Sequence, residues 1–203
     1  MGTVGWPVEL AEDGVGLRPL RLLDAPTWAE IRRRNADWLG QWEATPPGAA
    51  RPEGTTVAAF TSMTRHLRRQ ARDGSALPFA VTYGGALVGQ LTIGNIVHGS
   101  LNSGYAGYWV DERVAGRGVT PTALALAVDH CFSRVGLHRV EANIRPENTA
   151  SRRVVEKLGF RDEGIRLRYL HIDGAYRDHL CYAITVEEVP GGLLRRWRAR
   201  RAL

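Results

Sequence analysis

A glycine-punctuated turn between a strand-like segment and a helix-like segment is the feature that most constrains the fold of this chain. The turn spans Arg113 to Gly118 (RVAGRG), and the aromatic and β-branched run from Gly107 to Val110 that precedes it predicts a strand. After the turn, Thr120 is a good N-cap and Pro121 suits the first position of a helix. Such a turn directs backbone N–H groups and a helix dipole at one point, which favours a phosphate or pyrophosphate.

Two other phosphate-binding turns do not fit this segment. The G-x-G-x-x-G Rossmann fingerprint is absent, and no acidic residue follows at the required distance after a second strand. A P-loop is excluded because no Gly-Lys-Ser/Thr follows the glycines. Arg113 and Arg117 add positive charge beside the turn. The sequence therefore predicts an anion site of another kind.

The turn resembles the R-x-x-G-x-G/A acetyl-CoA signature of the GNAT N-acetyltransferases. A second predicted strand, Arg139 to Ile144, is followed by RPEN at residues 145–148 and by a short helix that ends in EKLGF at residues 156–160. This arrangement is similar to the RimJ/RimL-type branch, the ribosomal-protein alanine acetyltransferases that modify protein N-termini. The resemblance implies an α/β fold of the α+β type: a central, mixed, mostly antiparallel seven-stranded sheet, splayed between its fourth and fifth strands and flanked by helices.

The resemblance also implies acetyl-CoA as cosubstrate, and it assigns the contacts residue by residue. The strand containing Tyr108, Trp109 and Val110 would hydrogen-bond the pantetheine arm, and the main-chain N–H of Trp109 or Val110 would polarise the thioester carbonyl. We expect two asparagines, Asn143 and Asn148, to contact the cofactor as well. The pyrophosphate is expected at the turn, on Arg113, Gly116, Arg117, Gly118, Val119 and Thr120.

Acetyl transfer to an amine also requires a proton donor for the thiolate and an unprotonated amine. By resemblance Ser151 would lie near the sulfur as the acid, whereas its spacing from Asn148 also fits plain helix capping. Some relatives carry a glutamate at the position of Asn143, which cannot accept a proton, so the candidate bases are Glu141, on the same strand face, and Glu43. An α-amine with a pKa of about 7.7–8.0 is partly neutral already, so a water relay is an alternative.

The other predicted elements build the acceptor side and close the sheet. The tryptophan-rich loop Trp38 to Glu43 resembles the acceptor loop of the RimJ-like branch. The alternative interpretation is that its two tryptophans only cover the edge of the hydrophobic core. The predicted strands are 15–22, 78–82, 86–96, 103–110, 139–144, 165–172 and 177–186, and the predicted helices are 26–35, 55–71, one from 120 onward, and one from 148 to 158.

Length and charge predict one domain, residues 1–189, which the resemblance implies is an acetyltransferase domain, followed by an arginine-rich tail, residues 190–203. The chain of 203 residues is long enough for one core, and its net charge of +6 is concentrated in the tail, which holds five arginines and no acid. The tail is interpreted either as a frayed, solvated end or as a contact to RNA, a ribosome or an acidic partner.

The remaining composition favours a cytoplasmic protein. We expect no signal peptide and no membrane span, because no apolar run approaches ~20 residues. Cys131 and Cys181 lack metal-ligand spacing and are interpreted as buried small hydrophobes, so no metal is expected.

Three functions stay open at this point. The first is acetylation of the α-amine of a protein N-terminus, which the resemblance favours. The second is the same reaction on a small amine such as an antibiotic, a polyamine or an amino acid. The third is a non-catalytic CoA-binding or ribosome-associated protein. The sequence does not distinguish a monomer from a homodimer.

Overall fold

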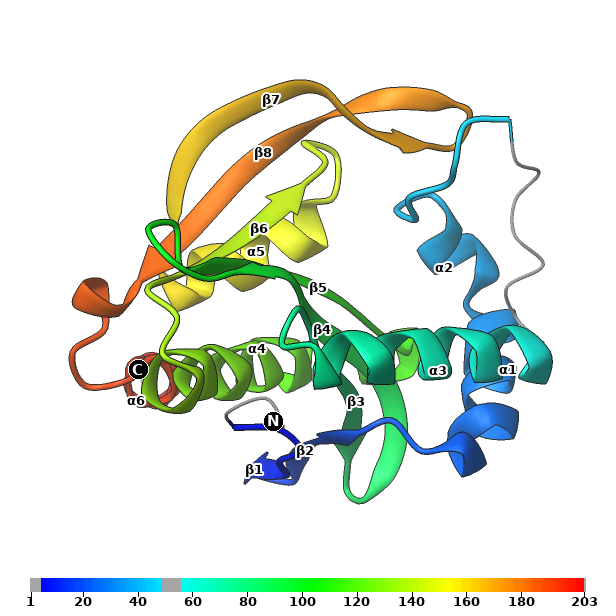
Figure 1. Cartoon of the computed structure of the whole chain (residues 1–203), viewed down its shortest axis with the longest axis horizontal. Helices are drawn as coiled ribbons and strands as arrows, with labels where there is room; N and C mark the ends of the chain where they lie inside the picture. The colour runs from blue at the N-terminus through cyan, green and yellow to red at the C-terminus, as the bar shows by residue number, and fades with distance from the viewer. Residues whose placement is uncertain (1–4, 49–55, 203) are drawn as a thin grey trace.

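A computed structural model describes residues 5–48 and 56–202 of the chain. Thr55, which belongs to the predicted helix 55–71, and Leu203, which belongs to the predicted tail, lie outside the described residues. The strands are β1 (Leu10–Glu12), β2 (Val15–Pro19), β3 (Leu77–Tyr83), β4 (Ala86–Val97), β5 (Ser103–Val110), β6 (Arg139–Ile144), β7 (Arg161–Ile172) and β8 (Ala175–Thr185) (Figure 1). The helices are α1 (Ala25–Arg34), α2 (Ala36–Gly40), α3 (Val57–Arg72), α4 (Val119–His130), α5 (Thr149–Leu158) and α6 (Leu193–Arg201), with short helical turns η1 (Leu22–Asp24), η2 (Glu112–Val114), η3 (Cys131–Val135) and η4 (Val186–Glu188).

The described strands form one sheet in the order β1-β2-β3-β4-β5-β6-β8-β7. Every neighbouring pair is antiparallel except β5 and β6, which are parallel. This agrees with the predicted fold class, with one strand more than the seven expected. The extra strand, β1, has only three residues and no alternating pattern to reveal it, and it exists because it pairs with β2.

The predicted splay lies between β5 and β6. The two strands pair only over Ser103–Tyr105 and Arg139–Glu141, after which β5 continues along β4 alone. Figure 1 shows β6 rising away from β5 toward the long β7–β8 hairpin. The sheet therefore opens along the second half of β5.

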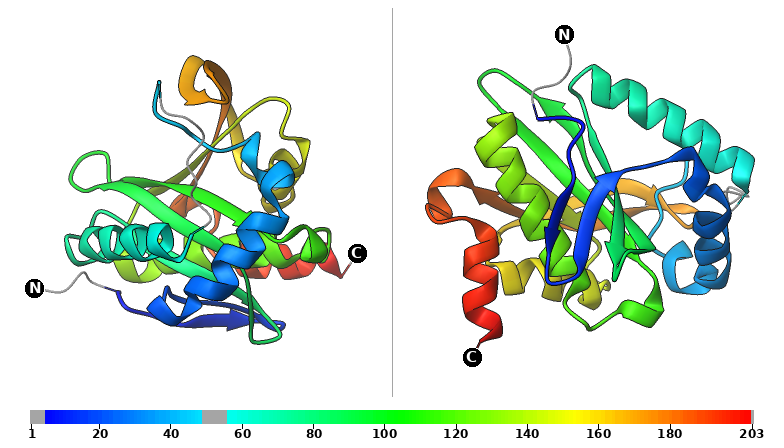
Figure 2. Two further views of the ribbon diagram at one scale, coloured as in Figure 1. Left: turned by 90° about the vertical axis from the view of Figure 1, so that its right-hand side faces the viewer. Right: turned by 90° about the horizontal axis from the view of Figure 1, so that it is seen from below.

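Helices cover both faces of the sheet (Figure 2). On one face α4 packs in the main hydrophobic core, and its residues are buried on almost every side, which explains its uniformly apolar sequence. On the other face α1 and α3 enclose a smaller cluster around Trp28 and Phe60. Successive β5 side chains alternate between the clusters, with Tyr108 and Val110 on the first and Trp109 on the second.

Two local details differ from the sequence-based expectation. Helix α4 begins at Val119, one residue before the predicted cap Thr120, because Gly118 adopts a left-handed conformation (φ +79°) and its carbonyl accepts the first helical hydrogen bond. The segment predicted as an acceptor loop begins with a helical turn, α2, whose Leu39 is buried. Beyond that turn, Ala44 forms an isolated antiparallel bridge to Ile172.

Residues 193–201 of the predicted tail form α6 and pack beside α4 and α5 (Figure 2). The carboxylate of Asp129 accepts the backbone N–H groups of Leu193 and Leu194, at 2.6 and 3.0 Å, which caps the helix. Leu193 is fully buried, and the indole Nε1 of buried Trp197 donates to Thr122 Oγ1 at 2.8 Å. Burial of these apolar side chains, together with the ion pairs of Arg198 with Glu12 and of Arg201 with Asp13, offsets the repulsion among the arginines of the helix.

None of the helices within residues 5–48 and 56–202 is long and apolar enough to cross a lipid bilayer.

The packing of α6 predicts a large loss of stability when its anchor is shortened. Leu193→Ala is expected to lower the free energy of unfolding by about 2–5 kcal/mol, because it leaves a cavity at a fully buried site. Arg195→Ala, on the exposed side of the same helix, is the control and should change it by less than about 0.5 kcal/mol. Urea denaturation measures both, and equal small effects would contradict a packed α6.

Candidate active site

The splay contains a cleft of about 770 Å³ that runs from the acceptor loop to α6. Its wall is built from six segments: the region after α1, the end of β5, the glycine turn, the first turn of α4, α5 with the residues just before it, and α6. The residues that line it are Trp38, Leu39, Gln41, Trp42, Glu43, Tyr108, Trp109, Val110, Val114, Ala115, Gly116, Arg117, Gly118, Val119, Thr120, Pro121, Glu147, Asn148, Thr149, Ala150, Ser151, Arg153, Val154, Lys157, Trp197 and Arg201.

The backbone of β5 presents an open hydrogen-bonding edge to this cleft. Asp111 donates its backbone N–H to Val88 O at 2.7 Å, so Asp111 and, by alternation, Trp109 point their backbone groups toward β4. The N–H and C=O groups of Tyr108 and Val110 consequently point toward the gap, where β6 no longer pairs. Of the two N–H groups considered from the sequence, the geometry favours that of Val110.

The glycine turn supplies an anion site at the next part of the cleft. Gly116 and Gly118 both have positive φ values, of +78° and +79°, which residues with a Cβ rarely adopt. No side chain caps the N-terminus of α4, so the backbone N–H groups of its first turn are available to a ligand. The N-terminus of the helix dipole adds positive potential at the same place. A phosphate or pyrophosphate fits this arrangement.

The start of α5 brings a hydroxyl pair to the cleft. Asn148 Oδ1 accepts the backbone N–H of Ser151 at 3.0 Å, so Asn148 is an N-cap, while both residues also line the cleft. The Ser151 hydroxyl has no hydrogen-bond partner among the described residues. Tyr108 donates its hydroxyl to Ser151 O at 3.4 Å, and burial raises the pKa of Tyr108 to about 12. At neutral pH this phenol therefore keeps its proton and can donate it.

The acceptor end of the cleft is held in place by two arginines. Arg32 forms an ion pair with Glu43, and its guanidinium lies over the rings of Trp28 and Trp109, at 5.6 and 5.2 Å from their centroids. These contacts fix a carboxylate at the end of the cleft that faces the sheet.

The second arginine belongs to the RPEN segment. Arg145 donates to Gln41 O at 2.9 Å and lies 5.3 Å from the ring centroid of Trp42. It thereby joins the loop after α2 to the junction between β6 and α5, so both walls of the acceptor end are connected.

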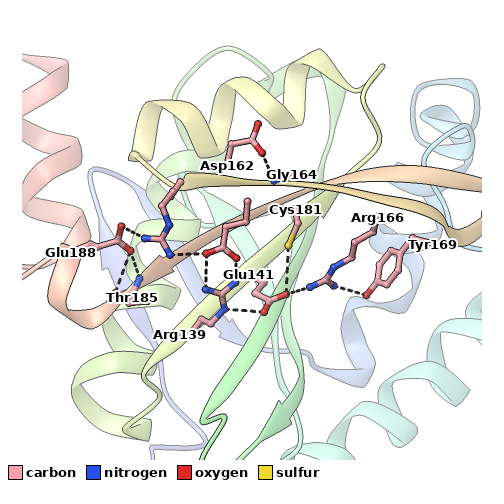
Figure 3. A network of polar contacts seen from close by, with 11 residues as sticks. Arg139, Glu141, Asp162, Gly164, Arg166, Tyr169, Cys181, Thr185 and Glu188 are labelled. Atoms are coloured by element: carbon pink, nitrogen blue, oxygen red, sulfur yellow. Dashed lines mark hydrogen bonds and ion pairs between the residues drawn. The ribbon is translucent and has the colours of Figure 1, made fainter.

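Three of the residues proposed from the sequence do not line the cleft: Glu141, Asn143 and Arg113. Figure 3 shows Glu141 between Arg139 and Arg166, whose guanidinium nitrogens lie 2.9 and 3.0 Å from its carboxylate. Asn143 shares that face of β6, because alternate side chains of the strand, Val140 and Ala142 among them, enter the core. The structure thus separates Glu141 from the acceptor end, where Glu43 lies.

The cleft residues that sequence reasoning missed include Arg153 and Lys157 on α5, and Trp197 and Arg201 on α6. The i, i+4 spacing of Arg153 and Lys157 places them on one face of α5 and was a usable signal. Trp197 and Arg201 had no such signal, because their position depends on how α6 packs against α4.

A buried carboxylate ties the acceptor side to the glycine turn. Asp111 accepts hydrogen bonds from Arg34 and from Asn35 Nδ2 (3.0 Å), and Asn35 Oδ1 accepts the backbone N–H of Glu112 at 3.0 Å. Burial acts to raise the pKa of Asp111, but the hydrogen bonds from Arg34 and Asn35 outweigh it and hold the pKa below its usual value. The end of α1 and the beginning of the turn are therefore held as one unit.

An open strand edge, an uncapped helix N-terminus and two hydroxyl groups along one cleft fit a long, phosphorylated ligand. The sequence comparisons give the family. The acetyltransferase (GNAT) domain family matches residues 15–161, and the chain belongs to this family. It is an N-acetyltransferase of the RimJ/RimL type, as the glycine turn and the RPEN segment indicated.

The relatives agree with this assignment. The chain is 31% identical over 170 residues to the probable N-acetyltransferase YjcK of Bacillus subtilis. This alignment covers 83% of this chain and 92% of the relative. It is 30% identical over 188 residues to the ribosomal protein uS5-alanine N-acetyltransferase of Escherichia coli, covering 91% and 94%. The structure of Mycobacterium smegmatis RimJ in complex with CoA-disulfide matches with a TM-score of 0.92 and 46% identity, covering 98% and 97%.

The Asp111 unit predicts a pH-dependent contribution to stability. Asp111→Ala should lower the free energy of unfolding by about 2–3 kcal/mol at neutral pH, because charge-assisted hydrogen bonds are lost at a buried site. Since the folded pKa is depressed, this contribution is present above the unfolded value of about 3.9 and is lost as pH falls through the folded pKa. Denaturation of both proteins between pH 7 and pH 2 measures it, and a gap that widens toward acid would contradict the assignment.

Proposed function

We propose that this protein transfers the acetyl group of acetyl-CoA to the α-amine of a protein N-terminus, with a ribosomal protein as substrate. The observation that carries the proposal is the single cleft that joins a phosphate-binding turn, an open strand edge and a fixed carboxylate. The Escherichia coli relative is named for acetylating an alanine of ribosomal protein uS5, which supports the acceptor class. The Mycobacterium smegmatis structure holds a CoA derivative, which supports the cosubstrate.

The residues of the cleft fit CoA along its whole length. The backbone at Gly116, Gly118 and the first turn of α4 would hold the pyrophosphate, with Arg117 adding charge. The open edge at Tyr108 and Val110 would pair with the amide groups of the pantetheine arm as a further strand does. When bound, acetyl-CoA supplies an activated acetyl group as a thioester.

The chain's own groups would act at three points of the reaction. The N–H of Val110 would stabilise the negative charge that develops on the thioester oxygen. The carboxylate of Glu43 would attract and orient the acceptor amine, which with a pKa of about 7.7–8.0 is partly neutral and can pass its proton to water. Tyr108 would donate a proton to the departing sulfur, because a phenol is a stronger acid than the Ser151 hydroxyl beside it.

The acceptor assignment is tested by thiol release from acetyl-CoA with a panel of amines. Peptides that begin with alanine or serine should be turned over, and the same peptides with a blocked N-terminus should not. Glu43→Gln should raise the KM for the peptide about tenfold, because one ionic contact to the amine is lost. Glu141→Gln is the matched control, outside the cleft, and should change kcat and KM by less than about twofold.

Other outcomes of the same panel would contradict the proposal. Turnover of small amines alone would favour the small-molecule acceptor. Binding of CoA without turnover of any amine would favour a binding protein. A larger rise of the peptide KM in Glu141→Gln than in Glu43→Gln would indicate that Glu141, and not Glu43, interacts with the acceptor amine.

The proton donor is tested separately. Tyr108→Phe should lower kcat by about 100-fold, within the range of general acid catalysis, with little change in the binding of CoA. Ser151→Ala removes the neighbouring hydroxyl and should lower kcat by less than about tenfold. Steady-state kinetics on folded variants measure both, and a more severe loss in Ser151→Ala would make Ser151 the donor that the resemblance implied.

A further inference from the structure

Helix α6 lies outside the residues that match the acetyltransferase family, yet it forms part of the cleft. The family match ends at residue 161, whereas Trp197 and Arg201 line the same cleft as the glycine turn. A Cβ on Gly118 would lie 3.6 Å from the Trp197 ring, so α6 is in direct contact with the turn. The far wall of the cleft is therefore supplied by a C-terminal helix that lies beyond the matched residues.

The charges of the cleft are divided between its two ends. Helix α5 runs along the wall, with Asn148 and Ser151 at the proposed reaction end and Lys157 roughly 9 Å beyond Ser151 along the helix axis. The two carboxylates that line the cleft, Glu43 and Glu147, belong to the reaction end. The cations that line the cleft are Arg117 on the glycine turn, Arg153 and Lys157 on α5, and Arg201 on α6.

Most of these cations have no protein carboxylate to neutralise them. Among the described residues, no ion pair or hydrogen bond involves the side chains of Arg117, Arg153 or Lys157. Several other arginines of the surface are paired, such as Arg161 with Glu163 and Glu188. Three cationic side chains without a carboxylate partner line one cleft, and such a group favours the binding of a multiply charged anion there.

Arg201 is held at this end by contacts on both sides. Its Nη1 lies 3.0 Å from Asp13 Oδ2, and its guanidinium lies 5.8 Å from the centroid of the Trp197 ring. On the preceding residue, Arg200 donates to the carbonyls of Glu156 and Lys157 at 3.1 and 2.5 Å, which joins the end of α6 to the end of α5. The Asp13 pair is exposed and uses part of the guanidinium, so other N–H donors stay available.

We propose that α6 completes a subsite for the terminal phosphate monoester of the cosubstrate, the 3′-phosphate of CoA, with Arg201 acting together with Lys157 and Arg153. This inference rests on the proposed function, since it takes CoA as the ligand. The pyrophosphate lies on the glycine turn, and the 3′-phosphate is the charged group furthest from the thiol. A phosphate monoester carries close to two negative charges at neutral pH, which matches a cluster of unpaired cations.

Calorimetric titration of the full chain with CoA and with 3′-dephospho-CoA tests the subsite. Wild type should bind CoA at least about tenfold more tightly than the dephospho form, since each charge-assisted contact contributes about one order of magnitude. Arg201→Gln should lose about tenfold in CoA affinity and keep its affinity for the dephospho form. Lys157→Gln should behave in the same way.

Arg195→Gln is the matched control, because it removes the same charge from the same helix outside the cleft and should leave both affinities unchanged. Equal binding of the two ligands by wild type, or an equal loss for both ligands in Arg201→Gln, would overturn the subsite while leaving the proposed function intact. Failure of wild type to bind either ligand would overturn both. Thermal unfolding of each variant confirms that the compared proteins are folded.

Discussion

The early end of the pairing between β5 and β6 is the constraint on which the site depends. Beyond Tyr105 and Glu141 the two strands separate, and the backbone groups of Tyr108 and Val110 have no strand to bond. Unpaired backbone groups away from water destabilise a protein by about 1–3 kcal/mol each, so a ligand that pairs with them has a ready source of affinity. The N-terminus of α5 fills part of the gap through the contact of Tyr108 with Ser151 and limits how far the sheet can close.

The rest of the molecule holds this gap between two fixed walls. Asp111 joins the end of α1 to the approach to the glycine turn, and Arg32 and Arg145 fix the acceptor loop from opposite sides. The donor and acceptor ends are thus connected through side chains that need not touch either substrate. Transfer between two bound groups depends on their relative placement, which is why such positioning contacts matter to the rate.

The parts of the site that the sequence predicted are those encoded by local residues. The glycine turn, the strand before it and the Asn148 cap each depend on neighbours within a few positions, and all three were found. Helix α6 was missed because its sequence is dominated by arginines. Its two buried apolar residues, Leu193 and Trp197, form a recognisable face only when the helix is packed against α4. The ion pairs of Glu141 could not be predicted, because strand alternation gives the face of Glu141 but not its contacts with Arg139 on the same strand and Arg166 on β7.

Some arginines of the chain are paired with carboxylates and others are not, so the net charge alone does not describe the electrostatic potential at the surface. A charge of +6 spread over a surface would predict general affinity for polyanions. Here Arg139, Arg161 and Arg166 are engaged by Glu141, Glu163 and Glu188 on the face shown in Figure 3, so they add little external potential. The cleft cations Arg117, Arg153 and Lys157, which have no ion pair among the described residues, add positive potential where the phosphates of acetyl-CoA would enter.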